Sequence, residues 1–256
     1  MPVIGLLPWM IPLLLVRPPS EVTGGPVLLE LFTSEGCSSC PPADALLAEL
    51  AAEPGPSGAE RIPLSFHVDY WDGQGWKDPF SSGAFTRRQR HYTECLGERS
   101  IYTPQLIVDG AVGLVGSDRV GARAALSSAA KNEKTAIVLS AEAASGDSPD
   151  SLPLRVRVES TERAKQKSVE IFVALTEDGL VSEVTRGENK GRRLSHVGVV
   201  RFLTSVRGLD KTVRVPLGKG WDHRALSVVA WVQESPCGPA LGVARMRATP
   251  PRESIP

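Results

Sequence analysis

Two cysteines separated by two serines, Cys37 and Cys40, lie between an apolar run and a helical pattern, and no other feature constrains the fold as much. Residues 27–32 are almost all apolar, which is typical of a short strand buried on both faces. Apolar residues then recur at positions 43, 46, 47 and 50, the spacing of an amphipathic helix. A strand, a Cys-x-x-Cys pair and a helix in this order are typical of thioredoxin-like redox domains.

The rest of the first half continues this alternation of strands and helices. Apolar residues alternate over 62–70, which predicts a second strand, and a helix is expected over 82–96. Residues 105–108 and 111–115 predict a hairpin around an Asp-Gly turn, and Ser117 is expected to cap a last helix. The order β-α-β-α-β-β-α predicts a thioredoxin-like α/β domain over residues 26–132. Of two consecutive prolines after the pair, Pro41 is tolerated in a first helical turn, whereas Pro42 is expected to strain or delay the first helix.

The second half changes in character, because the helical pattern disappears after about residue 134. Short apolar segments separated by Gly, Pro, Asp and Ser clusters predict a smaller, all-β, sandwich-like domain over residues 133–248. Residues 178–195 are polar and basic, and we expect an extended loop there. Residues 249–256 are expected to form a disordered tail. The predicted strands are 135–144, 152–160, 169–176, 196–204, 211–216, 226–234 and 241–247.

Composition and the N-terminal segment limit the partners and the location. The 29 basic and 29 acidic residues cancel, so no nucleic-acid partner is expected. Residues 3–16 are apolar but shorter than the roughly 20 residues of a membrane-spanning helix, so we expect no stable membrane insertion after processing. We interpret residues 1–25 as a signal peptide, with an uncleaved anchor or a different start site as alternatives. The protein is then expected to be periplasmic or otherwise exported, where disulfides persist.

The two cysteines of the pair are predicted to have different roles. Cys37 is expected at the start of a helix, where unpaired N–H groups lower a thiol pKa from about 8.5 to roughly 3.5–7.5 and favour the nucleophilic thiolate. Cys40 is then placed to attack a mixed disulfide formed on Cys37. Glu35 opposes the thiolate by charge repulsion, so we expect a moderate shift. Alternatives are an inert structural disulfide or half of a zinc site, although further zinc ligands lack the usual spacing. We expect no metal and no cofactor.

A second mark of the redox site is the dipeptide formed by Thr103 and Pro104, just before the third strand. Thioredoxin-like folds place a cis-proline opposite the cysteine pair, and the residue before it pairs with the backbone of a bound peptide. We therefore expect a cis bond here and a substrate-binding role for both residues. The alternative is an ordinary trans proline at the start of an edge strand.

Five sequence blocks resemble a bacterial family known only as domain of unknown function 1223. The resemblance implies a thioredoxin-like domain, usually behind an export signal, and a β-rich C-terminal part, but it implies no reaction. It says nothing about Cys95 or Cys237, which lie outside the family's pattern. The blocks are residues 30–44 around the cysteine pair, 65–72 (Ser-Phe-His-Val-Asp-Tyr-Trp-Asp), 75–79 (Gly-Trp-Lys-Asp-Pro), 102–105 (Tyr-Thr-Pro-Gln) and 187–191 (Gly-Glu-Asn-Lys-Gly).

Other polar and aromatic residues near the site have two interpretations each. Glu30, on the first strand, is either a buried acid that moves protons during exchange or a paired carboxylate at the strand edge. Trp71 and Trp76 follow the second strand and either form an apolar wall for a substrate peptide or are buried where the loop packs down. His67 either assists proton transfer or is a hydrogen-bonded structural histidine.

The remaining two cysteines and a basic segment complete the candidates. We expect Cys95 to be a buried free thiol, with a bridge to Cys237 as the alternative. A basic concentration in the second half is expected to be a solvated loop, and the alternatives are contact with the acidic N-terminal half of the chain or with an acidic partner. Its members are Arg186, Lys190, Arg192, Arg193 and His196.

The sequence therefore predicts an exported thiol–disulfide oxidoreductase whose partners are protein thiols, protein disulfides or a redox partner protein. In a second hypothesis the chain is a non-catalytic binding protein, and the oxidised pair only stabilises the fold. A third is copper handling by Cys37 and Cys40, since soft thiolates suit Cu(I), although no cluster of Met or His ligands accompanies them.

Overall fold

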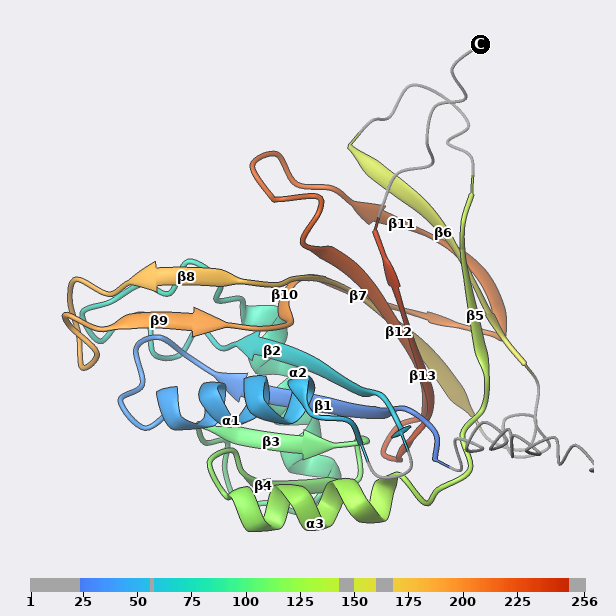
Figure 1. Cartoon of the computed structure of the whole chain (residues 1–256), viewed down its shortest axis with the longest axis horizontal. Helices are drawn as coiled ribbons and strands as arrows, with labels where there is room; N and C mark the ends of the chain where they lie inside the picture. Colours follow the sequence, from blue (N-terminus) through green and yellow to red (C-terminus); the bar gives the residue numbers. More distant parts are fainter. Residues whose placement is uncertain (1–23, 56–57, 143–149, 160–167, 249–256) are drawn as a thin grey trace, which may run out of the picture.

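The computed structural model describes residues 24–55, 58–142, 150–159 and 168–248 (Figure 1). The sequence expectations for the signal segment and for the tail at 249–256 fall on residues outside these ranges, apart from residues 24 and 25. The fold is mixed α/β, with one large mixed sheet and two smaller antiparallel sheets. Among the described residues no helix is both long and apolar enough to cross a membrane.

The first half has the predicted order of elements. Strand β1 pairs in parallel with β2 and antiparallel with β3, which forms a hairpin with β4. The hydroxyl of Ser82 accepts a hydrogen bond from the N–H of Ala84 and caps α2 as expected, whereas α3 is capped by Asp118 instead of Ser117. The elements are β1 (Val27–Thr33), α1 (Pro41–Ala52), β2 (Arg61–His67), α2 (Gly83–Cys95), β3 (Gln105–Val108), β4 (Val112–Val115) and α3 (Arg119–Ala129).

Helix α1 begins directly after the second cysteine of the pair. Cys40 is its N-cap, and Pro41 and Pro42 occupy the first turn. The prolines therefore do not delay the helix as expected, because the N–H groups they lack have no partner within a helix at these positions. The backbone carbonyl of Cys40 accepts hydrogen bonds from the N–H groups of Ala43 and Asp44 and so starts the helical ladder.

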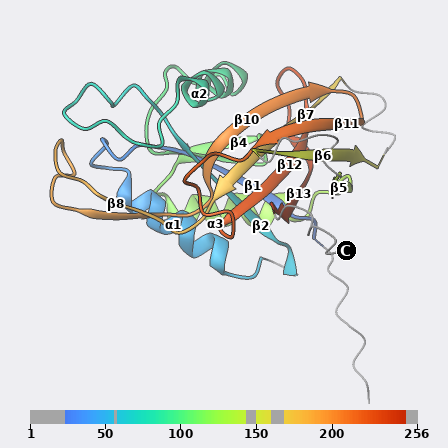
Figure 2. The ribbon, with the colours of Figure 1, turned by 90° about the horizontal axis from the view of Figure 1, so that it is seen from above.

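Successive side chains of β1 point to opposite faces of the sheet and so belong to two different layers of the core. Leu29 and Leu31 pack with apolar residues of α1 and α3, whereas Leu28 and Phe32 pack with residues of α2. Helix α2 consequently lies on the opposite side of the sheet from α1 (Figure 2). Because Glu30 has the same parity as Leu28 and Phe32, its side chain points toward α2 and away from the helix that carries the cysteine pair.

The second half contains all seven predicted strands, but it does not stand apart from the first. Val199 of β10 pairs with Ser65 of β2, so the strands join one sheet of order β13-β12-β7-β10-β2-β1-β3-β4. A separate three-stranded sheet, β11-β6-β5, covers one face of this extension over a large apolar core. The strands are β5 (Ile137–Ala141), β6 (Ser151–Val158), β7 (Val169–Glu177), β10 (Val199–Arg207), β11 (Asp210–Pro216), β12 (Leu226–Glu234) and β13 (Ala240–Arg247).

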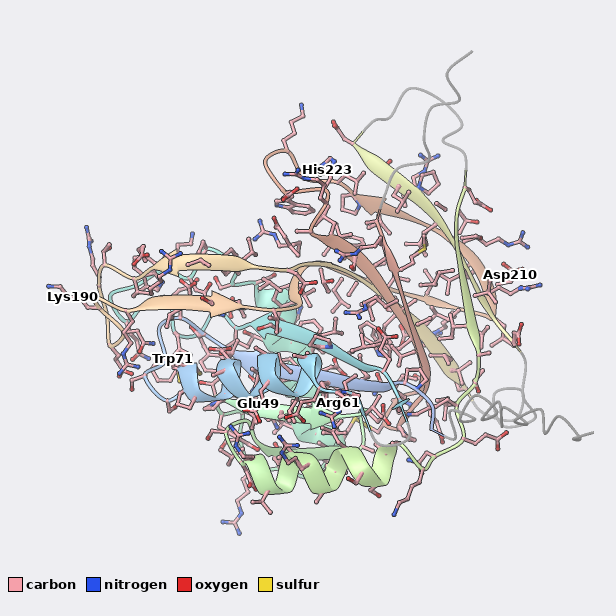
Figure 3. All side chains as sticks on the ribbon, viewed as in Figure 1. Glu49, Arg61, Trp71, Lys190, Asp210 and His223 are labelled. Carbon is pink, nitrogen blue, oxygen red and sulfur yellow. A yellow bond between two sulfur atoms is a disulfide. The ribbon has the colours of Figure 1, made fainter. Side chains whose placement is uncertain are left out.

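The expected loop at residues 178–195 is instead a β-hairpin. Its strands β8 (Leu180–Glu183) and β9 (Arg193–His196) pair antiparallel, and the turn between them contains Gly187 and Gly191, both at positive φ. The hairpin extends to the left in Figure 1, past α1, and β9 contacts that helix. Trp71 and Lys190 lie at this same end of the molecule (Figure 3). The loop expectation failed because each strand is only four residues long, Leu-Val-Ser-Glu and Arg-Leu-Ser-His, which is too short for a clear alternation of apolar and polar residues.

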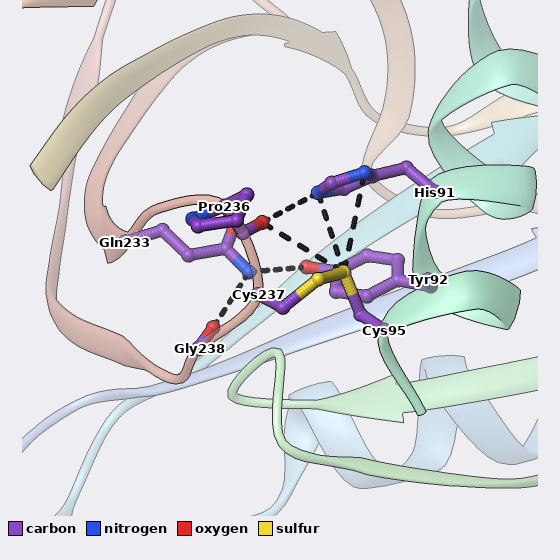
Figure 4. The surroundings of a disulfide bond; sticks show 7 residues. All are labelled: His91, Tyr92, Cys95, Gln233, Pro236, Cys237 and Gly238. Carbon is purple, nitrogen blue, oxygen red and sulfur yellow. Dashed lines mark hydrogen bonds between the residues drawn. A yellow bond between two sulfur atoms is a disulfide. The ribbon is translucent and has the colours of Figure 1, made fainter. Parts of the chain in front are cut away.

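A disulfide joins Cys95 at the end of α2 to Cys237 in the β12–β13 connection (Figure 4). The expectation of a free Cys95 thiol is therefore wrong, and the alternative bridge is correct. His91 lies beside the bridge and contacts the carbonyl of Pro236 at 2.6 Å. The bridge holds α2 against the strands of the second half, in line with their shared core.

Candidate functional site

Cys37 and Cys40 are free thiols in a loop and helix start at the carboxyl end of β1. The N–H of Cys40 donates to the carbonyl of Cys37, and that of Cys37 donates to Ser34, so the pair lies in a tight turn. Cys37 is only 1% exposed and Cys40 is fully buried, whereas Ser38 and Ser39 between them are exposed. The two serines are thus exposed at the surface, and the Cys37 sulfur lies just beneath it.

The environment lowers the pKa of Cys37 to about 6. A hydrogen bond with Cys40 is the largest cause, burial opposes it, and hydrogen bonds with Ser39 and Thr103 add to the lowering. Ser39 Oγ lies 3.2 Å from the Cys37 sulfur. Glu35 is not among these causes, because its carboxylate points toward other partners. Cys37 is therefore mostly a thiolate near neutral pH, as a nucleophile requires.

The pKa of Cys40 is shifted in the opposite direction. Burial raises the pKa of its thiol strongly, and the hydrogen bond and negative charge of Cys37 raise it further. Near neutral pH one thiol therefore holds a negative charge and the other holds a proton, a difference that thiol–disulfide exchange could use. Cys40 could act as a nucleophile only after it loses its proton.

Thr103 and Pro104 stand opposite the cysteines, and the bond between them is cis, as expected from the sequence. The Cys37 thiol points toward the carbonyl of Thr103 at 3.9 Å. The indole N–H of Trp71 donates to the Thr103 hydroxyl at 2.8 Å. A Cβ at Gly36 would lie 3.1 Å from the Cβ of Trp71, so Trp71 lies against the loop that carries Cys37. Trp71 is half-buried and belongs to the wall around the sulfur.

The tip of the β8–β9 hairpin contributes two further side chains. The buried amide of Asn189 donates to the carbonyls of Glu35 at 2.8 Å and of Cys37 at 2.9 Å. The exposed carboxylate of Glu188 accepts a hydrogen bond from the N–H of Ser38 at 2.9 Å. Both contacts fix the backbone of the cysteine loop, so the second half of the chain helps to shape the site in the first.

Several ionisable side chains are buried behind the cysteines. The carboxylate of Glu35 accepts hydrogen bonds from Trp76 at 2.8 Å and from His196 at 3.2 Å. His67 contacts Asp78 at 2.7 Å, and Asp78 also accepts the N–H of Glu35. The rings of His67 and His196 meet edge to face at 4.7 Å. His67 is therefore held as a hydrogen-bonded histidine, and Trp76 is held by Glu35 at the edge of this cluster.

Asp44 lies in the same buried cluster, one helical turn after Cys40. Its side chain is 8% exposed, and its Oδ1 atom lies 4.0 Å from Nδ1 of His196. Burial raises the pKa of Asp44 to about 7, the attraction of His196 opposes the rise, and the negative charges of Asp78 and Cys37 contribute to it. Near neutral pH the protonated and the ionised forms of Asp44 are therefore both populated.

The family model for "Protein of unknown function (DUF1223)" matches residues 28–233, which include the cysteine pair, the buried cluster and the hairpin. The chain belongs to this family. No curated protein matches the chain.

Two solved structures have a similar fold. Protein AGR_C_4864 from Agrobacterium tumefaciens is 24% identical, with a TM-score of 0.64, over 87% of this chain and 94% of that one. HBP35 of Porphyromonas gingivalis is 13% identical, with a TM-score of 0.63, over 88% of this chain and 75% of that one. At these identities the likeness concerns the fold alone.

The structure places Glu30 away from the cysteine pair. Its carboxylate accepts hydrogen bonds from Arg88 and Tyr92 of α2, both at 2.5 Å, on the face of the sheet opposite α1. Arg88 is buried as well and contacts Gln233 of β12. These contacts agree with the interpretation of Glu30 as a paired carboxylate, although at the centre of a buried network instead of a strand edge.

Sequence reasoning missed Asp44, His196, Glu188 and Asn189 as site residues. Three of them lie in blocks that resemble the DUF1223 family, and this was the one available signal. His196 was assigned to a solvated basic loop, whereas it is 3% exposed. A histidine among arginines and lysines gives no indication of burial when the strand that carries it is only four residues long.

Proposed function

We propose that this DUF1223 protein is an exported thiol–disulfide oxidoreductase built on a thioredoxin-like domain over residues 26–132. The opposite pKa shifts of the two thiols carry the proposal, with Cys37 near 6 and Cys40 raised well above its usual range. The helix start at Cys40 and the cis bond before Pro104 are features that this fold class shares. The disulfide at Cys95 supports an oxidising compartment.

The reaction follows from this division of roles. The Cys37 thiolate attacks one sulfur of a substrate disulfide, a mixed disulfide forms, and the first substrate thiolate leaves and takes a proton from solvent. Cys40 then loses its proton and attacks the Cys37 sulfur, which releases the second substrate thiolate. The substrate gains two electrons, and Cys37 and Cys40 end as a disulfide. A protein dithiol would reduce the pair again by the reverse sequence.

The residues around Cys37 would receive a protein substrate. The sulfur faces the Thr103 carbonyl, and the exposed Ser38 and Ser39 lie beside it. A peptide segment beside Thr103 would bring its own sulfur toward Cys37. The side chain of Trp71 would then lie against the peptide, and Trp76 acts farther back by holding Glu35.

A trapping experiment tests the proposal. Cys40→Ser removes the resolving thiol, so mixed disulfides on Cys37 should accumulate with specific partners in cells that express the protein. The matched control, Cys37→Ser with Cys40→Ser, should trap none. The purified pair should also have a reduction potential above about −300 mV, because structural disulfides lie below this value. Absence of trapped partners together with a lower potential would refute the proposal.

The burial of Cys37 favours one other function, that of a binding protein in which the pair only stabilises the fold. In that case the wild-type protein should be isolated with an intact disulfide that mild thiols do not reduce. The low pKa of Cys37 argues against this, since a structural pair gains nothing from a stabilised thiolate.

A further inference from the structure

We propose that Asp44 accepts the proton of Cys40 in the resolving step, and that His196 of the β8–β9 hairpin positions and tunes Asp44. The inference rests on the proposed exchange function and names the proton acceptor that this function requires. It also gives the second half of the chain a part in the chemistry of the first.

The geometry brings Asp44 and Cys40 together within one buried space. The Asp44 N–H donates to the Cys40 carbonyl at 3.1 Å, so the two residues are one turn apart at the start of α1. Thr33 at the end of β1 faces both, because its hydroxyl lowers the pKa of each. Asp44 Oδ1, Thr33 Oγ1 and His196 Nδ1 are all buried without a hydrogen-bond partner among the described residues.

Unpartnered polar atoms of this kind are rare in protein interiors and costly, by about 1–3 kcal/mol each. Asp44 Oδ1 lies 4.0 Å from His196 Nδ1, and the Thr33 hydroxyl lies close enough to Asp44 and Cys40 to lower both pKa values. This grouping beside a thiol suggests a route for a proton, because a carboxylate and an imidazole can each bind one. Two other acids on or just after β1 are buried, but both oxygens of each are paired. Glu30 binds Arg88 and Tyr92 across the sheet, and Glu35 binds Trp76 and His196. Asp44 is therefore the acid with a free oxygen beside Cys40.

His196 is fixed so that one ring nitrogen faces Asp44. Its Nε2–H donates to the Glu35 carboxylate at 3.2 Å, and the ring packs edge to face on His67 and on Phe80. The opposite nitrogen, Nδ1, is then directed at Asp44. The attraction between the two groups favours the ionised Asp44, which is the state that can accept a proton.

The charged and titratable groups that face Asp44 come from each element around it. Cys37 and Cys40 lie on the cysteine loop and α1, His196 on β9 and Asp78 on the loop after β2. Once Cys37 is in a mixed disulfide, its negative charge no longer opposes ionisation of Cys40 or Asp44. The proton of Cys40 then passes to Asp44, the new thiolate attacks the Cys37 sulfur, and the departing substrate sulfur takes the electron pair.

A single-turnover reaction with dithiobis(nitrobenzoate) isolates this step. Attack by Cys37 releases one coloured thiolate, and attack by Cys40 on the resulting adduct releases a second, without any biological partner. In the wild type the rate of the second release should show an inflection below pH 7, because the adduct removes the Cys37 charge that helps to raise the pKa of Asp44 to about 7. In Asp44→Asn the inflection should vanish and the second release should slow on the order of 100-fold, the usual effect of general base catalysis. The first release should change little.

Three further variants separate a role in proton transfer from a structural one. Asp44→Glu should restore part of the rate. His196→Gln should move the inflection to higher pH, because it removes the attraction that holds the pKa of Asp44 down. Asp109→Asn is the matched control: Asp109 is also buried, but it binds the N–H of Leu28 at the other end of β1, and its loss should leave the inflection in place.

The outcomes distinguish this inference from the proposed function. A second release in Asp44→Asn with the wild-type rate and inflection would overturn the role of Asp44 and leave the exchange function standing. A wild-type protein that shows no second release would overturn both, because Cys40 would then not resolve a mixed disulfide.

Discussion

The ion pair between Glu30 and Arg88 leads to a prediction that separates stability from catalysis. The Arg88 guanidinium bonds Glu30 at 2.5 Å and lies over the rings of Phe172 at 4.5 Å and Trp231 at 4.9 Å. Glu30→Gln keeps a side chain of similar shape but leaves the buried guanidinium without a counter-charge. Breaking a buried pair in this way costs about 3–5 kcal/mol. The ring contacts and the hydroxyl of Tyr92 remain, so we expect a loss of about 3 kcal/mol, at the low end of that range.

Urea unfolding followed by tryptophan fluorescence measures this loss, because Trp231 is fully buried beside Arg88. The double variant Glu30→Gln with Arg88→Met removes both charges and should recover much of the stability, with a coupling energy of roughly 2–3 kcal/mol. The double variant also remains informative if a single variant folds poorly. A Glu30→Gln protein of wild-type stability that has lost thiol exchange would refute the reasoning and return Glu30 to the list of catalytic residues.

Three further predictions concern the pKa values and the disulfide. Folding raises the pKa of Asp44 from 3.8 to about 7, so between these pH values the folded protein binds one more proton than the unfolded chain. The free energy of unfolding should therefore fall as the pH rises through this window, by about 4 kcal/mol in total. Urea unfolding at several pH values should show this fall in the wild type and a flatter profile in Asp44→Asn. The ultraviolet absorbance of the Cys37 thiolate should titrate near pH 6, and Cys40→Ala should move this titration upward because it removes the largest cause of the lowered pKa. Cys95→Ser opens a loop of 142 residues and should destabilise the protein by about 2–5 kcal/mol in the same unfolding assay, and an unchanged midpoint would contradict this.

The elements of the first half could be predicted from the sequence because their signals are local. The apolar run of β1, the helical spacing after Cys40 and the Asp-Gly turn at 109–110 depend only on neighbours in the chain. The cis bond before Pro104 also followed from its place in the order of elements. The seven strands of the second half were found for the same reason.

The arrangement of these elements was harder to predict, because it depends on pairings between distant segments. Nothing near Val199 indicates that its strand continues the sheet beside β2. The two strands share a single register pair, Val199 with Ser65, beside a hydrogen bond from the N–H of Ser65 to the carbonyl of Gly198. The direction of Glu30 could have been derived, since it shares parity with Leu28 and Phe32. That parity decides which face of the sheet an acid reaches, whereas distance along the chain from Cys37 does not.

Asp44 was visible as an exception to a pattern. It follows Ala43 and precedes Leu47 by three residues, so it lies on the apolar face of α1, where a carboxylate is expensive unless it is paired. Within the described residues its Oδ1 atom has no hydrogen-bond partner; His196 lies 4.0 Å away, and the Thr33 hydroxyl lies nearby. An unpaired acid on a buried helix face is a physical reason to suspect function, and it needs no knowledge of the rest of the fold.

The buried ionisable cluster as a whole argues against a purely structural role for the site. Glu35, Asp44, His67, Asp78 and His196 are each less than 10% exposed, and they come from β1 and its following loop, α1, β2, the loop after it and β9. Buried charges of this kind add little or nothing to stability compared with apolar residues of the same volume. If the cysteine pair only stabilised the fold as a disulfide, leucine would serve as well at several of these positions. These side chains come from both halves of the chain and meet behind Cys40. Their arrangement is explained if the second half completes a site that moves protons.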